Sequence, residues 1–427
     1  MSVARAPIDT VAFIDQYCAL YHEQFPDVRS FEHFKLLHLG LVAELPRKSL
    51  PAIAKAVGLH DGQELHHFLA HSPWKVADLR QQRLKLTKRM LHNRSFVLCI
   101  DETGDKKKGK TTDYVARQYI GNLGKLENGI VSVNAYGVVE NVTFPLLFQV
   151  FKPEKRLKAT DDYKTKPELA VLLIKELIEQ GFRFDVVLAD SLYGESTHFV
   201  DELLQLNLKF VVAIRSNHAV WLGLGQHLHY TRWRRFDRQF CNGESEERYI
   251  REIIFGKRGS IRYYQLTTDP KSLPKETTQF LMTNLSGDIR TELGNIYGLR
   301  TWIEYGFKQI KNELGWADYR VTDYEHIERW WETVCSTYLM ISLQAPIFRH
   351  QATNIDDEQQ TIYTQHQWWD AGSGWKNILN NVRLITQPYI FCCLLLPWLQ
   401  LFDIPGLYQG FRTLIAAMNG FHCYIPI

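Results

Sequence analysis

Three acidic residues, Asp101, Asp190 and Glu304, have the residue types and surroundings that metal-dependent phosphodiester chemistry needs. Asp101 follows the apolar run 96–100, and Asp190 lies just past a second one, 184–188. The carboxyl ends of neighbouring parallel strands meet at one edge of a sheet, so two aspartates there would lie close together. With a glutamate from a covering helix, they could hold two divalent ions that activate a nucleophile and stabilise the departing oxygen.

A structural role is the alternative for each of these carboxylates. A single aspartate at a strand end is more often a turn or helix-cap residue than a metal ligand. Two such aspartates, on strands that we expect to be adjacent, weaken that interpretation. Glu102 is a fourth carboxylate, but neighbouring residues of a strand point to opposite faces, so we expect it to point away from the others.

The segment around Glu304 carries cations at helical spacing. On one continuous helix, Tyr297, Arg300, Lys308 and Lys311 would all fall within about 40° of Glu304. Cations and a phenol on both sides of a carboxylate suit DNA phosphates that approach a metal site. The alternative is a salt-bridged surface helix, because Arg300 and Lys308 each lie four positions from Glu304.

Basic residues also gather elsewhere in the chain. Residues 210–262 hold ten Lys or Arg against five Asp or Glu, and Arg234 and Arg235 lie in the densest part. Lys107 belongs to a second basic run just beyond Asp101. Such clusters are typical of phosphate-neutralising surfaces, and we predict DNA contacts at these three residues. A solvated charged loop is the alternative for each cluster.

The elements that must position these residues follow from apolar periodicity. Residues 9–95 have helical spacing throughout. The segment 49–58 followed by a helix from Glu64 resembles a helix-turn-helix, although short helix pairs are more often plain packing units. From residue 95 the pattern indicates three strands, a crossover helix, a strand, a second helix and a further strand. We expect these segments at 96–100, 129–139, 143–151, 167–179, 184–188, 196–206 and 208–214.

This order predicts an α/β chain with a ribonuclease H-like mixed sheet and flanking helices. A β-rich insertion precedes Glu304, and the N-terminal domain is all-helical. We expect a helical N-terminal domain with candidate DNA binding (1–94) and a helical C-terminal region with candidate dimerisation (346–427). Between them lie the first part of the catalytic domain (95–214), the insertion (215–288) and the completion of the catalytic domain by the glutamate helix (289–345).

Composition narrows the class of protein and its cellular compartment. Hydrophobic residues make up 45% of the 427 residues and charged residues 23%, with a net charge of only +3. The seven cysteines include no Cys-x2-Cys pair, which argues against a zinc ribbon or a disulfide framework. Histidines cluster at 60, 66, 67 and 71, but no cysteine lies nearby to complete a familiar zinc site. We interpret the apolar segment 389–402 as a core helix and expect a cytoplasmic protein with no membrane span.

The spacing Tyr297-x2-Arg300-x3-Glu304-x6-Lys311 resembles the Tyr-Arg-Glu-Lys signature of bacterial insertion-sequence DDE transposases. The first aspartate of that family corresponds to Asp101 in Ile-Asp-Glu-Thr-Gly, and the second to Asp190 in Leu-Ala-Asp-Ser-Leu-Tyr-Gly. The 113 residues between Asp190 and Glu304 fit the β-rich insertion that members of this group carry.

This resemblance implies a double-stranded DNA substrate, namely the terminal inverted repeats of a mobile element and its target, and action as a homodimer on the bacterial nucleoid. It also implies two Mg²⁺ or Mn²⁺ ions held by Asp101, Asp190 and Glu304. One strand would be hydrolysed at each end and its 3′-hydroxyl joined to target DNA. Tyr297, Arg300 and Lys311 would then grip phosphates. The resemblance also implies that an aromatic residue of the insertion stacks on a flipped base, with Trp221, Tyr230 and Trp233 as candidates, although core packing is the commoner role for each.

Two other functions are compatible with parts of the pattern. A ribonuclease H-like DNA nuclease would use the same three carboxylates without strand transfer. A DNA-binding protein retired from catalysis would bind element ends without cutting them. The segment from Tyr297 to Lys311 argues against the first alternative, and the complete set of carboxylates argues against the second.

Overall fold

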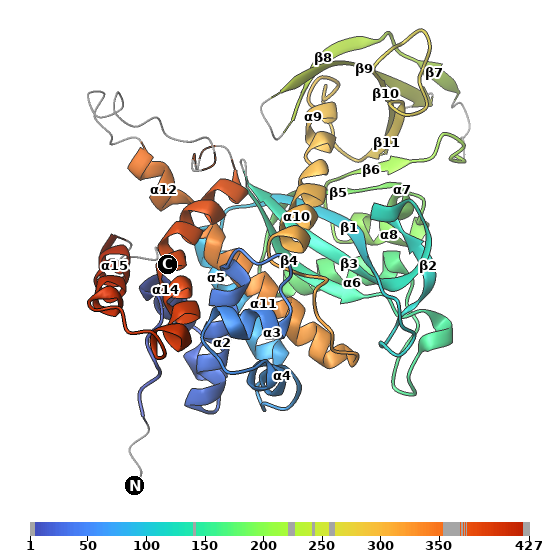
Figure 1. The fold of residues 1–427 in the computed structure, drawn as a ribbon. Coiled ribbons are helices and arrows are strands. Elements are labelled where there is room, and N and C mark those ends of the chain that lie inside the picture. The colour runs from blue at the N-terminus through green and yellow to red at the C-terminus, as the bar shows by residue number, and fades with distance from the viewer. Residues whose placement is uncertain are drawn as a thin grey trace, which may run out of the picture. The chain divides into compact units, whose positions relative to one another are not determined.

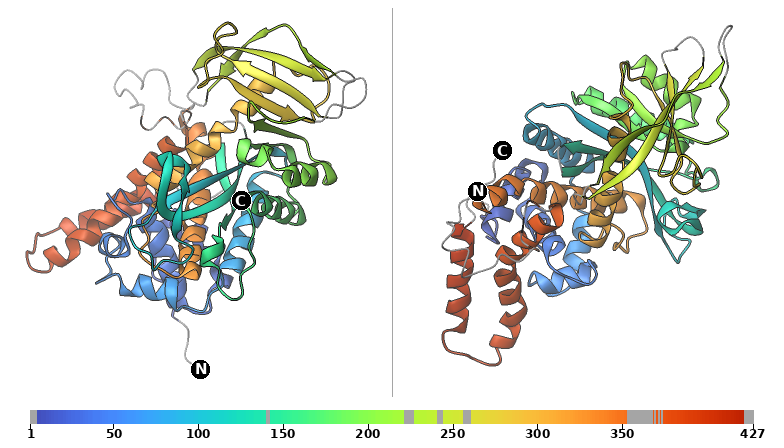
Figure 2. Two further views of the ribbon diagram at one scale, coloured as in Figure 1. Left: turned by 90° about the vertical axis from the view of Figure 1, so that its right-hand side faces the viewer. Right: turned by 90° about the horizontal axis from the view of Figure 1, so that it is seen from above.

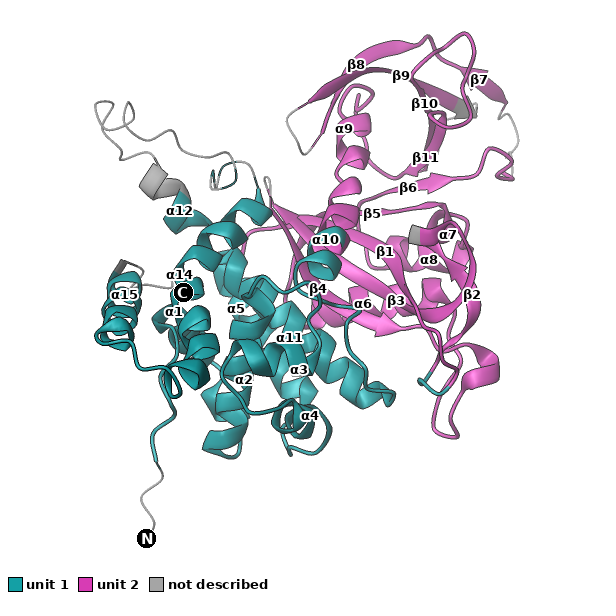
Figure 3. Ribbon diagram, in the orientation of Figure 1, with its two compact units in different colours: residues 1–92, 111–113, 308–427 teal, residues 93–110, 114–307 magenta. Residues whose placement is uncertain are grey.

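The computed structural model describes residues 5–139, 142–220, 227–240, 244–255, 261–352 and 374–421, together with 368, 370 and 372. The chain forms two compact units, shown in different colours in Figure 3. Unit 1 comprises residues 1–92, 111–113 and 308–427, and unit 2 comprises residues 93–110 and 114–307. Neither unit is one continuous stretch of chain.

Unit 2 is built on one mixed sheet of eleven strands, whose labels appear in Figure 1. At its centre, β1 (Phe96–Lys106) runs parallel to β5 (Phe184–Ala189), which runs parallel to β6 (Phe210–Ile214). On the other side, β1 pairs antiparallel with β3 (Lys125–Val139). The strands β2 (Ala116–Ile120) and β4 (Val142–Val150) also pair with β3. This arrangement confirms the predicted ribonuclease H-like sheet.

The first strand differs from the prediction. The apolar run ends at Ile100, but β1 continues to Lys106 because its antiparallel pairing with β3 goes on after the parallel pairing with β5 has stopped. Asp101 therefore lies within a strand, not after one. The strand β2, which follows the lysine-rich stretch, was also not predicted; its exposed and buried residues alternate, so it has no continuous apolar run.

Helices flank the sheet in unit 2. The helix α6 (Lys166–Glu179) begins with a capping box between Thr165 and Glu168, and its apolar side is buried. The helix α8 (Thr197–Gln205) packs against α6, and the short α7 (Ser191–Gly194) connects β5 to it. These helices confirm the two predicted crossover helices between the parallel strands.

The inserted region is rich in strands, as predicted, and these strands extend the same sheet. The strand β11 (Gln279–Thr283) pairs with β6, and the order continues through β10 (Arg262–Thr267) and β9 (Ser245–Phe255) to β7 (Leu228–Tyr230). The remaining strand, β8 (Arg234–Gln239), pairs with β9 along the same edge as β7, opposite β10. The insertion is thus joined to the central sheet by backbone hydrogen bonds.

Unit 1 is helical and is organised around α11 (Tyr324–Ser342), which is buried along most of its length. The N-terminal helices around it are α1 (Ala12–Ala19), α2 (Val28–Val42), α3 (Leu50–Ala56), α4 (Gln63–Ala70) and α5 (Val76–Met90). The Tyr17 hydroxyl donates to the Ser336 carbonyl, and Glu332 pairs with Arg80 and Arg83 inside the unit. The helical character predicted for residues 9–95 is confirmed.

The C-terminal part of unit 1 contains α12 (Ala345–Ala352), α14 (Trp375–Leu399) and α15 (Leu407–Phe421). Figure 2 shows α14 and α15 side by side. The interpretation of 389–402 as a core helix is wrong: Ile390 and Cys392 are buried, but Trp398 is 46% exposed and Leu401 78%. By length and composition alone, α14 could cross a membrane, and 28% of its most apolar stretch is buried inside the structure.

Candidate active site

Two neighbouring strands bring Asp101 and Asp190 to the same edge of the sheet. In the parallel pairing of β1 with β5, the last pair in register is Ile100 with Ala189. Each aspartate is the next residue of the chain: Asp101 continues β1, and Asp190 directly follows β5. The sequence therefore predicted the proximity of the two carboxylates correctly, although Asp101 lies inside a longer strand than expected.

Asp101 is almost fully enclosed, with 8% of its surface exposed. Its Oδ1 accepts from the backbone N–H of Glu102 at 2.8 Å, and its Oδ2 accepts from Nη1 of Arg300 at 2.8 Å. Burial raises the pKa of Asp101 to about 7, and the negative charge of Asp190 acts in the same direction, while Arg300 opposes both. Asp101 is thus a buried carboxyl group whose charged form depends on nearby positive charge.

Asp190 caps the short helix α7, because its Oδ1 accepts from the backbone N–H of Leu192 at 2.9 Å. A close approach to β6 holds this helix in place. A Cβ added to Gly194 would lie 1.9 Å from the carbonyl oxygen of Ala213, so only glycine fits here. The position of Asp190 therefore depends on Gly194 as well as on β5.

The helix that carries Glu304 differs from the predicted one. Instead of one continuous helix, α9 (Leu293–Gly298) ends before α10 (Thr301–Asn312) begins, and Arg300 lies in the turn between them. Hydrogen bonds to the third preceding residue tighten this turn, as between the Arg300 N–H and the Tyr297 carbonyl at 3.0 Å. Tyr297 is consequently buried in α9, with 7% exposed, whereas Glu304 is exposed on α10.

Arg300 joins two of the three carboxylates. Its Nη1 lies 2.8 Å from Asp101, and its Nη2 lies 3.0 Å from Glu304 Oε1. Among the described residues, no three Asp, Glu, His or Cys side chains are arranged to hold a metal ion. The oxygen donors nevertheless fit a hard divalent cation in their chemistry. A cation that binds Oδ2 of Asp101 and Oε1 of Glu304 must displace the guanidinium of Arg300 or share these two oxygens with it.

A cavity of about 700 Å³ lies beside this cluster in unit 2, and its lining includes Asp190, Tyr297 and Arg300. Lys275 and Gln279 come from the inserted region and line the same cavity. Burial raises the pKa of Tyr297 to about 12, so its phenol is protonated at neutral pH. The cavity thus presents a carboxylate, a phenol and a guanidinium to whatever enters it.

The other predicted contact residues have different surroundings. Lys308 and Lys311 lie farther along α10; Lys308 is exposed and Lys311 half-buried. Lys107 follows β1, six residues of extended chain beyond Asp101, or about 20 Å along the strand direction. Arg234 and Arg235 are exposed on β8, where Arg235 Nε pairs with Glu247 at 2.8 Å.

Two of the predicted stacking aromatics contact the same cation. The guanidinium of Arg251 lies 4.2 Å from the ring centroid of Tyr230 and 4.4 Å from that of Trp233. Trp221 lies outside the described residues.

The histidines considered for zinc include His67 and His71, whose ring centroids lie 5.5 Å apart. Among the described residues, no group of histidine, cysteine or acidic side chains could hold a metal ion.

The sequence did not reveal the polar residues behind the carboxylates. Glu102 points away from Asp101, as predicted, and pairs with Lys166 of α6 at 2.8 Å. Glu102 Oε2 and the hydroxyl of the fully buried Tyr193 have no hydrogen-bond partner among the described residues. Tyr193 stands three residues after Asp190, and only that proximity could have suggested it from the sequence.

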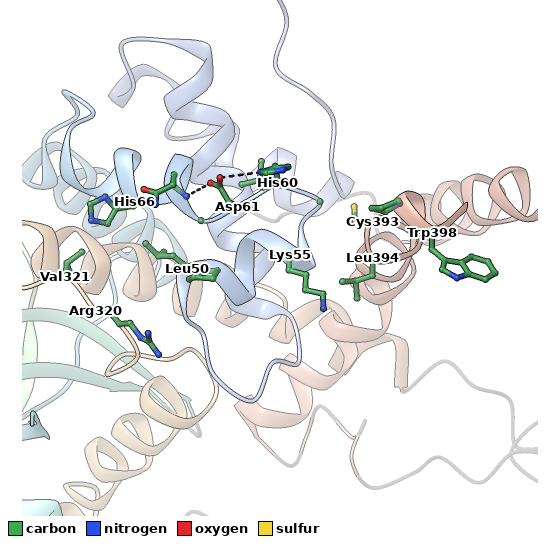
Figure 4. A pocket seen from close by; sticks show the side chains of 16 residues that line it. Leu50, Lys55, His60, Asp61, His66, Arg320, Val321, Cys393, Leu394 and Trp398 are labelled. Carbon is green, nitrogen blue, oxygen red and sulfur yellow. Dashed lines mark hydrogen bonds and ion pairs between the residues drawn. The ribbon is translucent and has the colours of Figure 1, made fainter. Parts of the chain in front are cut away.

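A larger cavity lies elsewhere, in unit 1. It measures about 1010 Å³ and lies where the chain between α3 and α4 faces α14, as Figure 4 shows. Its lining includes Lys55 of α3, His60 and Asp61 from the chain between α3 and α4, and Leu394 and Trp398 of α14. It contains none of the three catalytic candidates, so size alone does not identify the active site.

Comparison with known proteins decides the family. Residues 21–238 match the model of the DDE superfamily endonucleases, and residues 157–340 match the model of the transposase DDE domain. A "Probable transposase for insertion sequence element IS701" from Microchaete diplosiphon is 57% identical over 325 residues, which cover 76% of this chain and 86% of that relative. The chain belongs to the insertion-sequence DDE transposases.

Membership of this family makes the chain a DNA-cleaving enzyme that depends on divalent metal. The endonuclease model spans Asp101 and Asp190, and the transposase model spans Asp190 and Glu304. Together the two matches span all three carboxylates, and Asp190 lies in both.

Proposed function

We propose that this transposase binds the terminal inverted repeats of its mobile element, cleaves the DNA at their ends and joins the freed ends to target DNA. In this proposal Asp101, Asp190 and Glu304 hold two Mg²⁺ or Mn²⁺ ions. The observation that carries it is the cluster itself. Arg300 forms ion pairs with Asp101 and Glu304, and Asp190 follows the strand beside Asp101.

The chemistry consists of two transfers at phosphorus. In the first, a water oxygen bonds to the phosphorus at the element's end, the P–O3′ bond breaks, and a 3′-hydroxyl and a 5′-phosphate result. In the second, that 3′-hydroxyl attacks a target phosphodiester and releases a target 3′-hydroxyl. When bound, the divalent ions supply charge for the attacking and the departing oxygen.

The residues of this chain would bind and orient the DNA. Burial of Asp101 removes water from one wall of the site, which strengthens every charge interaction there. Arg300, freed from Asp101 when a cation binds, is placed to take a phosphate oxygen with its planar guanidinium. The protonated phenol of Tyr297 can donate to a second oxygen, and Lys308 and Lys311 extend the positive charge along α10.

The remaining parts of the proposal concern assembly and location. We propose that two copies act together, one at each element end, with the C-terminal region 346–427 as the dimerisation region. The N-terminal region 1–94 and the basic residues Lys107, Arg234 and Arg235 would bind DNA outside the site. The enzyme would act on the nucleoid in the bacterial cytoplasm. A nuclease without strand transfer is the second candidate, since the same three carboxylates suffice for cleavage alone.

The test uses labelled DNA carrying the element ends with Mg²⁺ and compares wild type with Asp101→Asn, Asp190→Asn and Glu304→Gln. Each variant should bind the ends with near wild-type affinity and lose cleavage and joining by at least about a thousandfold, because the carboxylates hold metal. Nicking without joining by the wild type would favour the nuclease candidate. Full cleavage by any of the three variants would show that the active site is assigned wrongly.

A further inference from the structure

One arginine near the active site lacks the partners that an enclosed guanidinium normally has. Arg238 lies on β8 and is partly buried. Its Nε is shielded from solvent and has no hydrogen-bond partner among the described residues. A buried donor without an acceptor costs free energy, so such groups in a folded protein call for an explanation.

The neighbours of Arg238 explain why its Nε has no acceptor. Glu246 stands directly opposite on β9, but its Oε2 accepts from Arg248 Nε at 2.7 Å. Burial lowers the pKa of Arg238, and the positive charges of Arg248 and Arg300 act in the same direction, while Glu246 and Tyr297 oppose them. Arg238 thus lies near two other arginines, and its Nε–H is a donor that an anionic oxygen could accept from.

Arg238 is held firmly in position. Its guanidinium lies 5.0 Å from the ring centroid of Phe240, a cation–π distance. The strand that carries it is attached to α9 by two hydrogen bonds through Asn295, one from the Gln239 N–H at 3.0 Å and one to the Asp237 carbonyl at 3.1 Å. Phe236 packs so closely on α9 that a Cβ at Gly294 would lie 2.2 Å from its ring.

This attachment places Arg238 beside the catalytic cluster. Its Nε lies 3.5 Å from the position that a Cβ would take at Gly298, the last residue of α9. Arg300 follows two residues later. Arg238 and Arg300 therefore face a common region from two elements, β8 and the turn between α9 and α10.

We propose that Arg238 binds a phosphate of the DNA strand next to the cleavage point, so that β8 of the insertion holds DNA within the active site itself. The proposal rests on the proposed function and adds a contact to it. The ligand is a phosphodiester oxygen. The planar guanidinium supplies the unpaired Nε–H together with an adjacent N–H, a geometry that matches a phosphate group.

The experiment compares Arg238→Gln with a matched control, Arg183→Gln. Arg183 has the same charge but precedes β5, at the opposite end of that strand from Asp190. Binding of a duplex carrying the element's terminal repeat is measured by fluorescence anisotropy from about 50 to about 200 mM salt. Arg238→Gln should weaken binding about tenfold and reduce the slope of log affinity against log salt by about one. Arg183→Gln should leave the slope unchanged.

Thermal melting of the free protein separates a ligand contact from a packing role. Because Arg238→Gln removes a shielded Nε–H that has no acceptor, the variant should melt at or above the wild-type temperature. Arg238→Lys keeps the charge but not the planar donor pair, and it should recover the salt slope with only part of the affinity.

Three outcomes would overturn the proposal. Arg238→Gln could bind the duplex with the wild-type affinity and slope, or it could melt several degrees lower, which would make Arg238 a packing residue. In both cases the proposed function would still hold, provided that the wild-type protein itself binds and cleaves the duplex. If the wild type neither binds nor cleaves the terminal-repeat duplex, the proposed function and the role of Arg238 fail together.

Discussion

Arg300 provides, in the absence of metal, the positive charge that the carboxylates of the site require. A buried carboxylate such as Asp101 is costly unless it is paired. Glu304 takes the other end of the same guanidinium. The arrangement stabilises the metal-free protein, and it means that metal binding must compete with an ion pair already in place.

This competition predicts how Arg300→Gln responds to metal. Loss of the guanidinium leaves Asp101 without its cation, so the variant without metal should be less stable than wild type by about 2 kcal/mol. Adding Mg²⁺ or Mn²⁺ should raise its melting temperature more than that of the wild type, because the ion no longer displaces an arginine. Differential scanning fluorimetry with and without metal measures both effects.

Arg290→Gln is the control for this prediction, because Arg290 pairs with Asp288 in the insertion and contacts none of the three carboxylates. Its melting temperature should respond to metal as in the wild type. An equal response of Arg300→Gln and wild type would mean that Arg300 does not compete with the ion.

Among the elements, the short helix α7 has the tightest constraint. Gly194 allows α7 to pack closely against β6, and Asp190 is the N-cap of α7. Gly194→Ala should force α7 away from the Ala213 carbonyl and displace Asp190. A displacement of about 1 Å reduces catalysis about a hundredfold. Single-turnover nicking of end DNA would measure the loss.

Gly121→Ala is the matched control, because a Cβ at Gly121 meets no atom within 4 Å. It should nick DNA at the wild-type rate. If Gly194→Ala also does so, the placement of Asp190 does not depend on α7.

The element scale also shows what the sequence could predict. Parallel strands buried on both faces have continuous apolar runs, so the pair β1 and β5 and the aspartates that follow the runs could be recognised. The end of β1 could not, because its last residues owe their extended state to pairing with β3, a partner distant in sequence. The break between α9 and α10 was missed because helical periodicity alone does not register a tightened turn.

The sequence also could not predict residues whose role depends on the lack of a hydrogen-bond partner. Arg238 was only one of several arginines in a basic stretch until the structure showed that Glu246 pairs with Arg248. Similarly, the apolar run 389–402 has the composition of a core helix, and only the packing of α14 shows that much of it is exposed. Composition gives the chemical type of each side chain, whereas the residues that it contacts depend on the whole fold.

For the whole molecule, buried histidines predict how stability depends on pH. His38 is fully buried between the Phe34 carbonyl and the Ser336 hydroxyl, and burial lowers its pKa to about 4. Its unfolded pKa is about 6.5. Protons therefore bind the unfolded chain first, and the stability that is present above pH 6.5 is lost as pH falls toward 4, by about 3 kcal/mol. Burial also lowers the pKa of His33, which contributes in the same window.

Urea unfolding at several pH values between about 7 and about 5 should show this decline. His38→Gln should lower stability at pH 7 because a buried hydrogen-bonded side chain is replaced, but it should also flatten the pH dependence. A slope as steep as that of the wild type would assign the decline to other groups.

The discontinuous make-up of unit 1 has a consequence for how the chain is made. Its first 92 residues pack on α11, where Arg329 donates to the carbonyls of Leu69, Ser72 and Trp74. During synthesis, 250 more residues must be added before the end of α11 at Ser342 is reached. At about 5–20 residues per second, the leading helices wait roughly 12–50 s with their apolar faces uncovered. We therefore expect the nascent chain to need chaperone protection in this interval, during which the sheet of unit 2 can already fold.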